Sequence, residues 1–222
     1  MLLDHLEKIR NGKMKEEWRF PDTREILPFL ERIVIGGSQP PTSLVEVLKQ
    51  DYGINIFLSW GMTEISPCGV VGSLKRSMSR NAEDEKYLLK PGRIMYGVDM
   101  KVVHDVDEEA DVDADKNMQR PGRLMVKGPW VISRYWNADS DAVDTDGWFD
   151  TGDVAKIDNE GYLDIVDRSK DVIKSGGEWI SSLALENASA ANSAVDSSAG
   201  PGTAAIAVSH PKWGERPIRE FP

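Results

Sequence analysis

Polar side chains between residues 146 and 180 are the first candidates for ligand chemistry. Thr151, Asp153, Asp167 and Arg168 each fall at the end of an expected strand, where a rigid sheet can hold them toward one ligand. Asp153 has no basic neighbour in sequence, and its carboxylate can accept two hydrogen bonds at fixed spacing, which suits a pair of sugar hydroxyls. Arg168 can donate to the same sugar or to a phosphate. These residue types indicate a sugar or phosphate ligand.

Turn residues predict the elements that position these side chains. Asp146-Gly147 and Asn159-Glu160-Gly161 are turn formers, because Gly adopts positive φ and Asn or Asp closes local hydrogen bonds. Apolar residues at 154–157 and 162–166 predict the two strands of one hairpin between and after these turns. From spacing alone, a charged hairpin with solvated turns is as good an interpretation as a binding site.

Longer segments of the same stretch resemble a known family. DGWFDTGDVAKID, GYLDIVDRSKDVIKSGGEWIS and LEN, in this order, resemble the signature of the adenylate-forming enzymes, and specifically the AMP-forming acyl-CoA synthetases that act on fatty acids. The resemblance implies a fatty acid–CoA ligase that uses ATP, a carboxylic acid and CoA as substrates and Mg²⁺ as cofactor. It also implies that Asp153 and Arg168 bind the nucleotide.

Composition and charge narrow the class of protein. The chain has 222 residues, 40% of them hydrophobic and 29% charged, as in globular proteins with a buried core. A net charge of −10 argues against nucleic acid and anionic membranes as partners. Cys68 is the only cysteine, and the sequence shows neither a signal-peptide pattern nor an apolar run long enough for an integral membrane segment. We therefore expect a cytoplasmic protein whose partners are small-molecule substrates.

An α/β unit is predicted upstream of the hairpin. A short strand at 33–35 runs into the turn GGSQPP, an amphipathic helix follows at 44–48, and a second strand covers 54–58. Ligands of such units bind beyond the carboxyl ends of the strands. The family resemblance places Gly37, Ser38 and Gln39 next to the nucleotide. It also implies that residues 37–41 and 68–71, which are small or apolar, line the acyl pocket.

The second strand leads into SWGMTE, which resembles another family motif. In this reading Trp60 stacks on adenine, Gly61 leaves room for the backbone to approach, and Thr63 donates its hydroxyl to the α-phosphate. Glu64 supplies the carboxylate for Mg²⁺, which prefers one or two carboxylates together with phosphate oxygens and water. Without the resemblance, Thr-Glu after a strand would be a helix cap as often as a metal ligand.

The remaining segments complete the predicted architecture. Residues 73–90 are expected to form a surface loop, 105–115 an acidic solvated loop, and residues near 1–32 a helix pair. Strands at 100–106, 122–127 and in the hairpin predict a small β-barrel-like subdomain. The expected fold is α/β. Residues 1–168 would form the C-terminal part of a large domain with a parallel αβ unit and this subdomain, and 169–222 the start of a small, mobile α+β C-terminal domain.

The resemblance also implies a hinge and a CoA site. Lys170 occupies the position about which the small domain would rotate between the two half-reactions, and a hinge needs only backbone freedom at a domain boundary. Gly176 and Gly177 would approach the pantetheine arm of CoA, and Lys174 would assist the thioester step. Gly128-Pro129 and Tyr135-Trp136 match a family segment to which we assign a structural role only.

Residues 189–204 are mostly too small to bury much apolar area. Two elements of the family are also not found in this sequence. The missing elements are a phosphate-wrapping loop ending in Pro-Lys-Gly and a downstream lysine that acts in adenylation. Because one preorganised cation contributes roughly 10²–10³ in rate, we expect little or no ligase activity from this polypeptide alone. A complementing chain is therefore a candidate partner.

Three functions stay open. The first is part of a fatty acid–CoA ligase with an intact nucleotide wall. The second is a non-catalytic nucleotide-binding remnant or scaffold, which would bind AMP or ATP without acid-dependent pyrophosphate exchange. The third is a relative that activates a different carboxylic acid.

Overall fold

The computed structural model describes residues 29–38, 40, 42–78, 84, 86–104, 119–190 and 204–220. Several predictions therefore lie outside the described residues. These are nearly all of the helix pair near 1–32, the site residue Gln39, the acidic loop at 105–115, and most of the small-residue run at 189–204. Among the helices of the described residues, none is long and apolar enough to cross a membrane.

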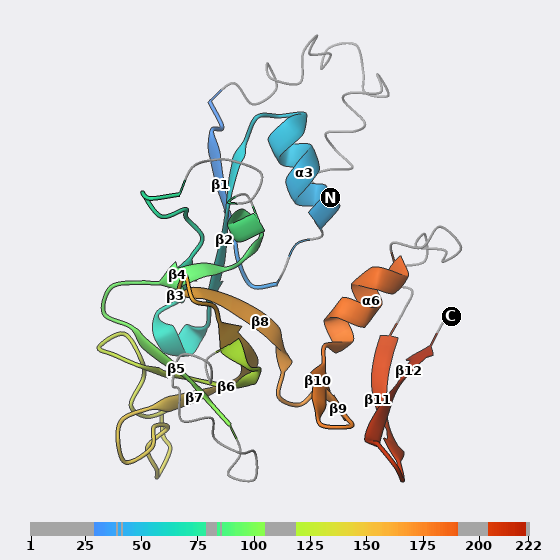
Figure 1. The fold of residues 1–222 in the computed structure, drawn as a ribbon. Helices are drawn as coiled ribbons and strands as arrows, with labels where there is room; N and C mark the ends of the chain where they lie inside the picture. Colours follow the sequence, from blue (N-terminus) through green and yellow to red (C-terminus); the bar gives the residue numbers. More distant parts are fainter. Residues whose placement is uncertain are drawn as a thin grey trace.

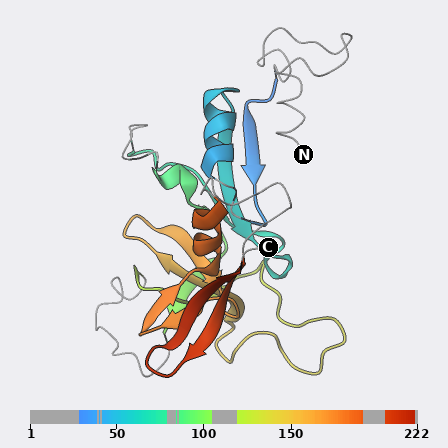
Figure 2. The same ribbon diagram turned by 90° about the vertical axis from the view of Figure 1, so that its right-hand side faces the viewer.

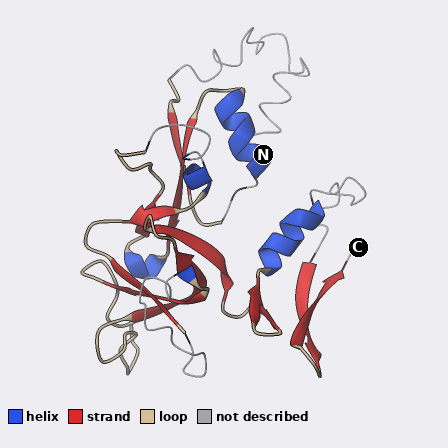
Figure 3. Cartoon of the chain, in the orientation of Figure 1, coloured by secondary structure: helices blue, strands red, loops and turns tan. Residues whose placement is uncertain are grey.

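The larger of the two sheets in the described chain is mixed and has eight strands, in the order β1-β2-β3-β4-β8-β7-β6-β5 (Figures 1 and 3). Its strands are β1 (Arg32–Ile35), β2 (Asn55–Gly61), β3 (Cys68–Val71), β4 (Gly92–Ile94), β5 (Asp99–Val103), β6 (Gly122–Lys127), β7 (Phe149–Ile157) and β8 (Tyr162–Arg168). Two short 3₁₀ helices, η2 (Thr63–Ile65) and η3 (Lys86–Leu89), interrupt the connections. The predicted α/β class is confirmed.

The parallel αβ unit forms one end of this sheet. β1 pairs with β2 in parallel, and α3 (Thr42–Gln50) crosses between them and lies against both strands (Figures 1 and 2). The helix buries Val45 and Leu48 against alternate residues of β2, Ile56 and Leu58. The alternation of buried and partly exposed residues along β2 explains why this segment is a strand, since successive side chains point to opposite faces.

The antiparallel part of the sheet is open and does not close into a barrel. β8 pairs with β7 on one side and with β4 on the other, so the sheet continues through β3 into β2 instead of returning to β5. β5 pairs with β6 and is the last strand in the order. The barrel-like description is corrected in this respect. The core of this antiparallel part is formed by apolar residues from several strands, among them Val70, Leu124, Val126, Phe149 and Leu163.

The predicted surface loop at 73–90 is tied to the tip of the β7–β8 hairpin. Lys75 pairs with Glu160 and Lys90 with Asp158, each at 2.6 Å. The phenol of Tyr162, which is fully buried, donates to the carbonyl oxygen of Ser73 at 2.8 Å. The predicted surface loop also contains η3, so its last residues form a 3₁₀ helix that the sequence did not predict.

A second, four-stranded sheet follows β8, in the order β10-β9-β12-β11. Its elements are β9 (Ile173–Ser175), β10 (Glu178–Ile180), α6 (Ser182–Ala190), β11 (Ala204–His210) and β12 (Gly214–Glu220). A turn at 169–172 joins it to the first sheet, and the amides of Asp171 and Val172 both donate to the carbonyl oxygen of Arg168. The predicted division between 1–168 and 169–222 falls at the end of β8 and stays a prediction.

We predict that Asp158→Ala lowers the free energy of unfolding by about 2 kcal/mol at neutral pH. Partial burial alone would raise the pKa of Asp158, but hydrogen bonds from Lys90 and from the backbone of Tyr162 and Glu160 outweigh burial and lower that pKa. A lowered folded-state pKa means that this stability is present above the unfolded pKa of about 4 and is lost as the pH falls through the folded value. Urea unfolding at several pH values measures it.

Asp164→Ala is the matched control, because Asp164 forms a 3.4 Å ion pair with Lys156 on the same hairpin and both side chains are more than a third exposed. Its loss should cost no more than about 0.5 kcal/mol. Equal costs for the two variants, or a cost for Asp158→Ala that does not change below about pH 4, would contradict the assignment.

Candidate functional site

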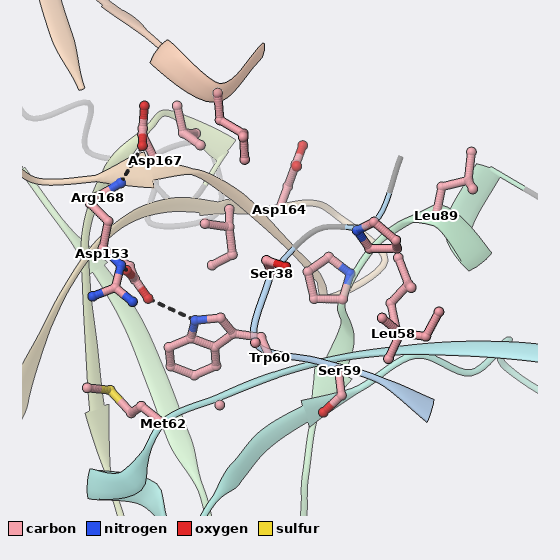
Figure 4. Close-up of a pocket in the computed structure, with 18 residues that line it drawn as sticks. Ser38, Leu58, Ser59, Trp60, Met62, Leu89, Asp153, Asp164, Asp167 and Arg168 are labelled. Atoms are coloured by element: carbon pink, nitrogen blue, oxygen red, sulfur yellow. Dashed lines mark hydrogen bonds and ion pairs between the residues drawn. The ribbon is translucent and has the colours of Figure 1, made fainter. Parts of the chain in front are cut away.

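One pocket lies where the αβ unit meets the β7–β8 hairpin (Figure 4). Its lining comes from the carboxyl ends of β1 and β2, the turn after β1, the end of the 73–91 connection, one residue of β7, most of β8, and the first turn of α6. The predicted site residues that line it are Gly37, Ser38, Trp60, Gly61, Asp153 and Arg168. Segments far apart in the sequence therefore contribute to one cavity.

Asp153 is the centre of the polar end of this pocket. It is the direct cross-strand partner of Arg168, and the Arg168 Nε atom lies 3.0 Å from its Oδ1 atom. Its Oδ2 atom accepts a hydrogen bond of 2.8 Å from the indole Nε1–H of Trp60 (Figure 4). Asp153 and Trp60 are buried, whereas 68% of the Arg168 side chain is exposed. The structure thus brings together the carboxylate, guanidinium and indole that the sequence singled out.

Burial decides the electrostatics of Asp153. Desolvation raises its pKa above the ordinary value for aspartate, and the hydrogen bond from Trp60 and the charge of Arg168 offset only part of this effect. Each carboxylate oxygen accepts one bond from the protein, which leaves further acceptor capacity on both oxygens. Asp153 is therefore a fixed, partly desolvated acceptor that faces the pocket.

Trp60 is held in place by tight packing beneath it. A side chain on Gly69 would come within 2.8 Å of the indole ring, so only glycine fits behind it. Gly61 is also required by the protein itself, because a side chain there would collide with the carbonyl oxygen of Pro67. Gly37 has a φ of +92°, and nothing lies within 4 Å of the position that a Cβ atom would take there, which suits close approach of a ligand to the backbone.

Two of the polar residues at the predicted strand ends serve the fold. Thr151 is buried, and its hydroxyl donates to the carbonyl oxygen of Leu124 at 2.9 Å. Asp167 lines the pocket but uses both oxygens within the protein: Oδ1 accepts from the Arg168 amide, and Oδ2 accepts from the amide and the hydroxyl of Ser182. Of the four side chains expected to face one ligand, Asp153, Asp167 and Arg168 line the pocket and Thr151 does not.

Thr63 and Glu64 are the first two residues of η2 and come directly after the pocket residue Met62. Neither of them lines the pocket. Thr63 is exposed. Glu64 is fixed by a residue to which we gave only a structural role, since the Tyr135 hydroxyl donates to its Oε1 atom at 2.9 Å. This hydrogen bond raises the pKa of Tyr135. The backbone of Glu64 is also held, because its carbonyl oxygen accepts from the Ile132 amide at 2.9 Å.

The donor set at Glu64 fits Mg²⁺ only together with a phosphate. Among the described residues, no three His, Cys, Asp or Glu side chains gather to hold a metal ion. Mg²⁺ does not require such a group, because it is usually held by one or two carboxylates together with substrate phosphates and water. One carboxylate oxygen of Glu64 accepts the hydrogen bond from Tyr135, and the other oxygen can serve as a ligand of Mg²⁺.

The residues assigned to the hinge and to CoA lie away from the pocket. Lys170 is exposed in the turn between the two sheets. Gly176 and Gly177, with φ values of +62° and +88°, form the β9–β10 turn. Residues 177–179 share a separate cleft with Arg120 and Pro121. The amide of Lys174 donates to Glu215 at 2.7 Å, and its ammonium lies 4.3 Å from the Trp179 ring centroid. Their roles stay predictions.

Apolar residues that the sequence did not single out complete the pocket wall. Besides Pro40, which was expected, they are Ile35, Leu58, Met62, Leu89, Pro91, Ile165, Val166 and Leu183. Residues 68–71 do not line this pocket, and their expected place in an acyl site stays a prediction. In β3, Gly69 and Val70 are buried behind Trp60 in the core. The apolar period of β2 could have indicated Leu58, but only tertiary packing brings Leu89 and Leu183 to this wall.

Comparison with known proteins gives consistent matches. The model of the AMP-binding enzyme family matches residues 2–136. A medium-chain-fatty-acid–CoA ligase from Ectopseudomonas oleovorans is 41% identical over 191 residues, which are 85% of this chain and 33% of that protein. A 3-methylmercaptopropionyl-CoA ligase from Ruegeria lacuscaerulensis is 42% identical over 194 residues, which are 86% of this chain and 34% of that protein.

A solved structure shares the fold as well as part of the sequence. The o-succinylbenzoate CoA synthetase from Bacillus subtilis, in complex with its acyl-adenylate intermediate, matches with a TM-score of 0.64 and 30% identity, over 85% of this chain and 35% of that chain. The present chain thus spans about a third of the length of these relatives. It belongs to the AMP-binding enzymes, the adenylate-forming family that includes the acyl- and aryl-CoA ligases.

Proposed function

We propose that this chain forms the nucleotide-binding wall of an AMP-forming carboxylic acid–CoA ligase. The observation that carries the proposal is the buried carboxylate of Asp153, held between the Trp60 indole and the Arg168 guanidinium at the polar end of one pocket. Family membership supports the same assignment. In this proposal the Asp153 carboxylate accepts hydrogen bonds from both ribose hydroxyls, and the terminal N–H groups of Arg168 donate hydrogen bonds to the ribose or the phosphate.

The adenine ring would bind beside the indole of Trp60. Gly37 and Ser38, which line the pocket from the turn after β1, would approach the base through their backbone. Thr63 and Glu64, one and two residues beyond the pocket residue Met62, would lie next to the phosphates. Mg²⁺ bound at Glu64 would neutralise phosphate charge there. The Tyr135 hydroxyl would keep the Glu64 side chain in one orientation.

The apolar wall supports an aliphatic acid as the second substrate. Leu58, Leu89 and Ile165 lie in the same cavity as Asp153, so an apolar chain could bind next to the nucleotide. Two relatives of about 40% identity are named for a medium-chain fatty acid and for 3-methylmercaptopropionate, both of which are aliphatic acids. An aromatic acid is the alternative, supported by the o-succinylbenzoate enzyme at 30% identity.

The proposed reaction has two steps. The acid carboxylate attacks the α-phosphorus of ATP and displaces pyrophosphate, and the thiolate of CoA then attacks the carbonyl carbon of the acyl-adenylate and displaces AMP. The part of this chain in the first step is to bind and orient the nucleotide, which brings the reacting atoms together. Lys174, Gly176 and Gly177 are proposed to serve the second step after rotation about Lys170.

We predict that Asp153→Ala weakens AMP binding about tenfold or more, because charge-assisted hydrogen bonds to ribose are lost. Isothermal titration calorimetry on the purified chain measures the affinity. Asp150→Ala is the control on the same strand, since Asp150 pairs with Arg123 outside the pocket. It should change AMP affinity by less than about twofold. Equal losses for the two variants would argue against ribose recognition by Asp153.

The pH dependence of nucleoside binding provides a second prediction. Protonation of Asp153 removes the charge that strengthens its hydrogen bonds, so affinity should fall as the pH is lowered through its pKa. Because burial raises this pKa, the fall should occur above about pH 4, where an ordinary aspartate titrates. Adenosine is the ligand of choice, because it has no phosphate that titrates in this range.

Asp153→Asn should bind adenosine more weakly than the parent chain and show no such step, since its side chain does not titrate. A step at or below about pH 4 in the parent chain would contradict the raised pKa. The same step in both proteins would assign the titration to another group.

Exchange of labelled pyrophosphate into ATP separates a ligase from a non-catalytic nucleotide-binding protein. With ATP, Mg²⁺ and a panel of aliphatic and aromatic acids, a competent site gives exchange that depends on the acid. AMP binding without any exchange, even with a complementing chain that carries the Pro-Lys-Gly loop and the downstream lysine, would support the non-catalytic alternative.

A further inference from the structure

Asp167 connects the end of the eight-stranded sheet to the start of helix α6 at a buried point. Asp167 and Ser182 are 9% and 8% exposed, respectively. The Oδ2 atom of Asp167, at the end of β8, accepts hydrogen bonds of 2.7 Å from both the amide and the hydroxyl of Ser182, the first residue of α6. Its Oδ1 atom accepts from the Arg168 amide, which fixes the orientation of the carboxylate.

This contact spans the turn at 169–172. Asp167 lies before the predicted hinge residue Lys170, and Ser182 lies after it, so a rotation about this turn would separate the two side chains. The N-terminus of a helix carries partial positive charge and unpaired N–H groups, which favour a carboxylate at this position. The helix also has a local cap, because the Ser181 hydroxyl accepts from the Ala184 amide at 3.1 Å.

The position of α6 decides part of the pocket wall. Leu183, the residue after Ser182, lines the pocket together with Trp60 and Asp153. A further cleft remains between residues 164–166 of β8 and the start of α6, lined by Ser181, Leu183 and Ala184. Apolar packing therefore does not fill this seam, and the buried hydrogen bonds of Asp167 are suited to fix where α6 sits.

We propose that Asp167 is a positioning residue that holds α6 against the pocket through Ser182 and thereby places Leu183 in the pocket wall. Ligand binding and the seating of α6 are then coupled. A ligand that contacts Leu183 shifts α6 toward the position against the pocket. Displacement of α6 from that position lowers the affinity for the ligand by the corresponding factor. Only the choice of AMP as probe rests on the proposed function.

Amide hydrogen exchange without ligand tests the contact directly. Asp167→Asn and Ser182→Ala each weaken or remove a bond across the turn, whereas Ser181→Ala removes only the local cap of the same helix. The first two variants should increase exchange about tenfold both within 182–190 and in the turn at 169–172. Ser181→Ala should increase exchange within 182–190 alone. If all three variants give the same pattern, Asp167 is only a helix cap and the proposal is wrong.

AMP affinity tests the coupling to the pocket. Asp167→Asn and Leu183→Ala should both weaken AMP binding several-fold, and Ser181→Ala should leave it unchanged. Normal AMP affinity in Asp167→Asn would overturn the coupling. If the parent chain does not bind AMP at all, the proposed function fails, and the exchange pattern at 169–172 still decides whether Asp167 holds α6.

Discussion

The pairing of Asp153 with Arg168 across the β7–β8 hairpin is the interaction on which the pocket depends. It exists only in one register, because a shift of one residue would turn each side chain to the other face of the sheet. The tip of the hairpin fixes this register through the side chain of Asp158, which accepts hydrogen bonds from the amides of Glu160 and Tyr162. An irregularity at Val154 and Ala155 then adjusts the pairing next to Asp153.

A second constraint is the continuity of the sheet between the αβ unit and this hairpin. β2 carries Trp60, and β3 and β4 connect β2 to β8 in one hydrogen-bonded series. The indole therefore reaches Asp153 from a strand far away in sequence, with Gly69 leaving the space behind its ring. The buried carboxylate has a partner on each oxygen, which is what makes its burial tolerable.

The sequence predicted those parts of the fold that local chemistry determines. Asp146-Gly147 and Asn159-Glu160-Gly161 marked the hairpin because turn residues act over a few positions, and apolar alternation marked β2. The contacts of Tyr135 with Glu64 and of Asp167 with Ser182 had no local signal, since each joins segments that meet only in the folded chain. The open sheet was missed for the same reason, because strand order depends on long-range pairing.

The two sheets have different relations to the pocket. The eight-stranded sheet supplies the polar end and much of the apolar wall, whereas the chain after β8 contributes only Leu183, at the start of α6. The β9–β10 hairpin, with Lys174 and the two glycines, lies elsewhere.

A crystal structure of the chain with AMP is the most direct test of the central claim, that one buried carboxylate recognises the ribose. We expect both ribose hydroxyls to lie within hydrogen-bond distance of the Asp153 carboxylate, with the adenine ring beside the indole of Trp60. AMP bound at another place, or bound in this pocket with its ribose turned away from Asp153, would contradict it.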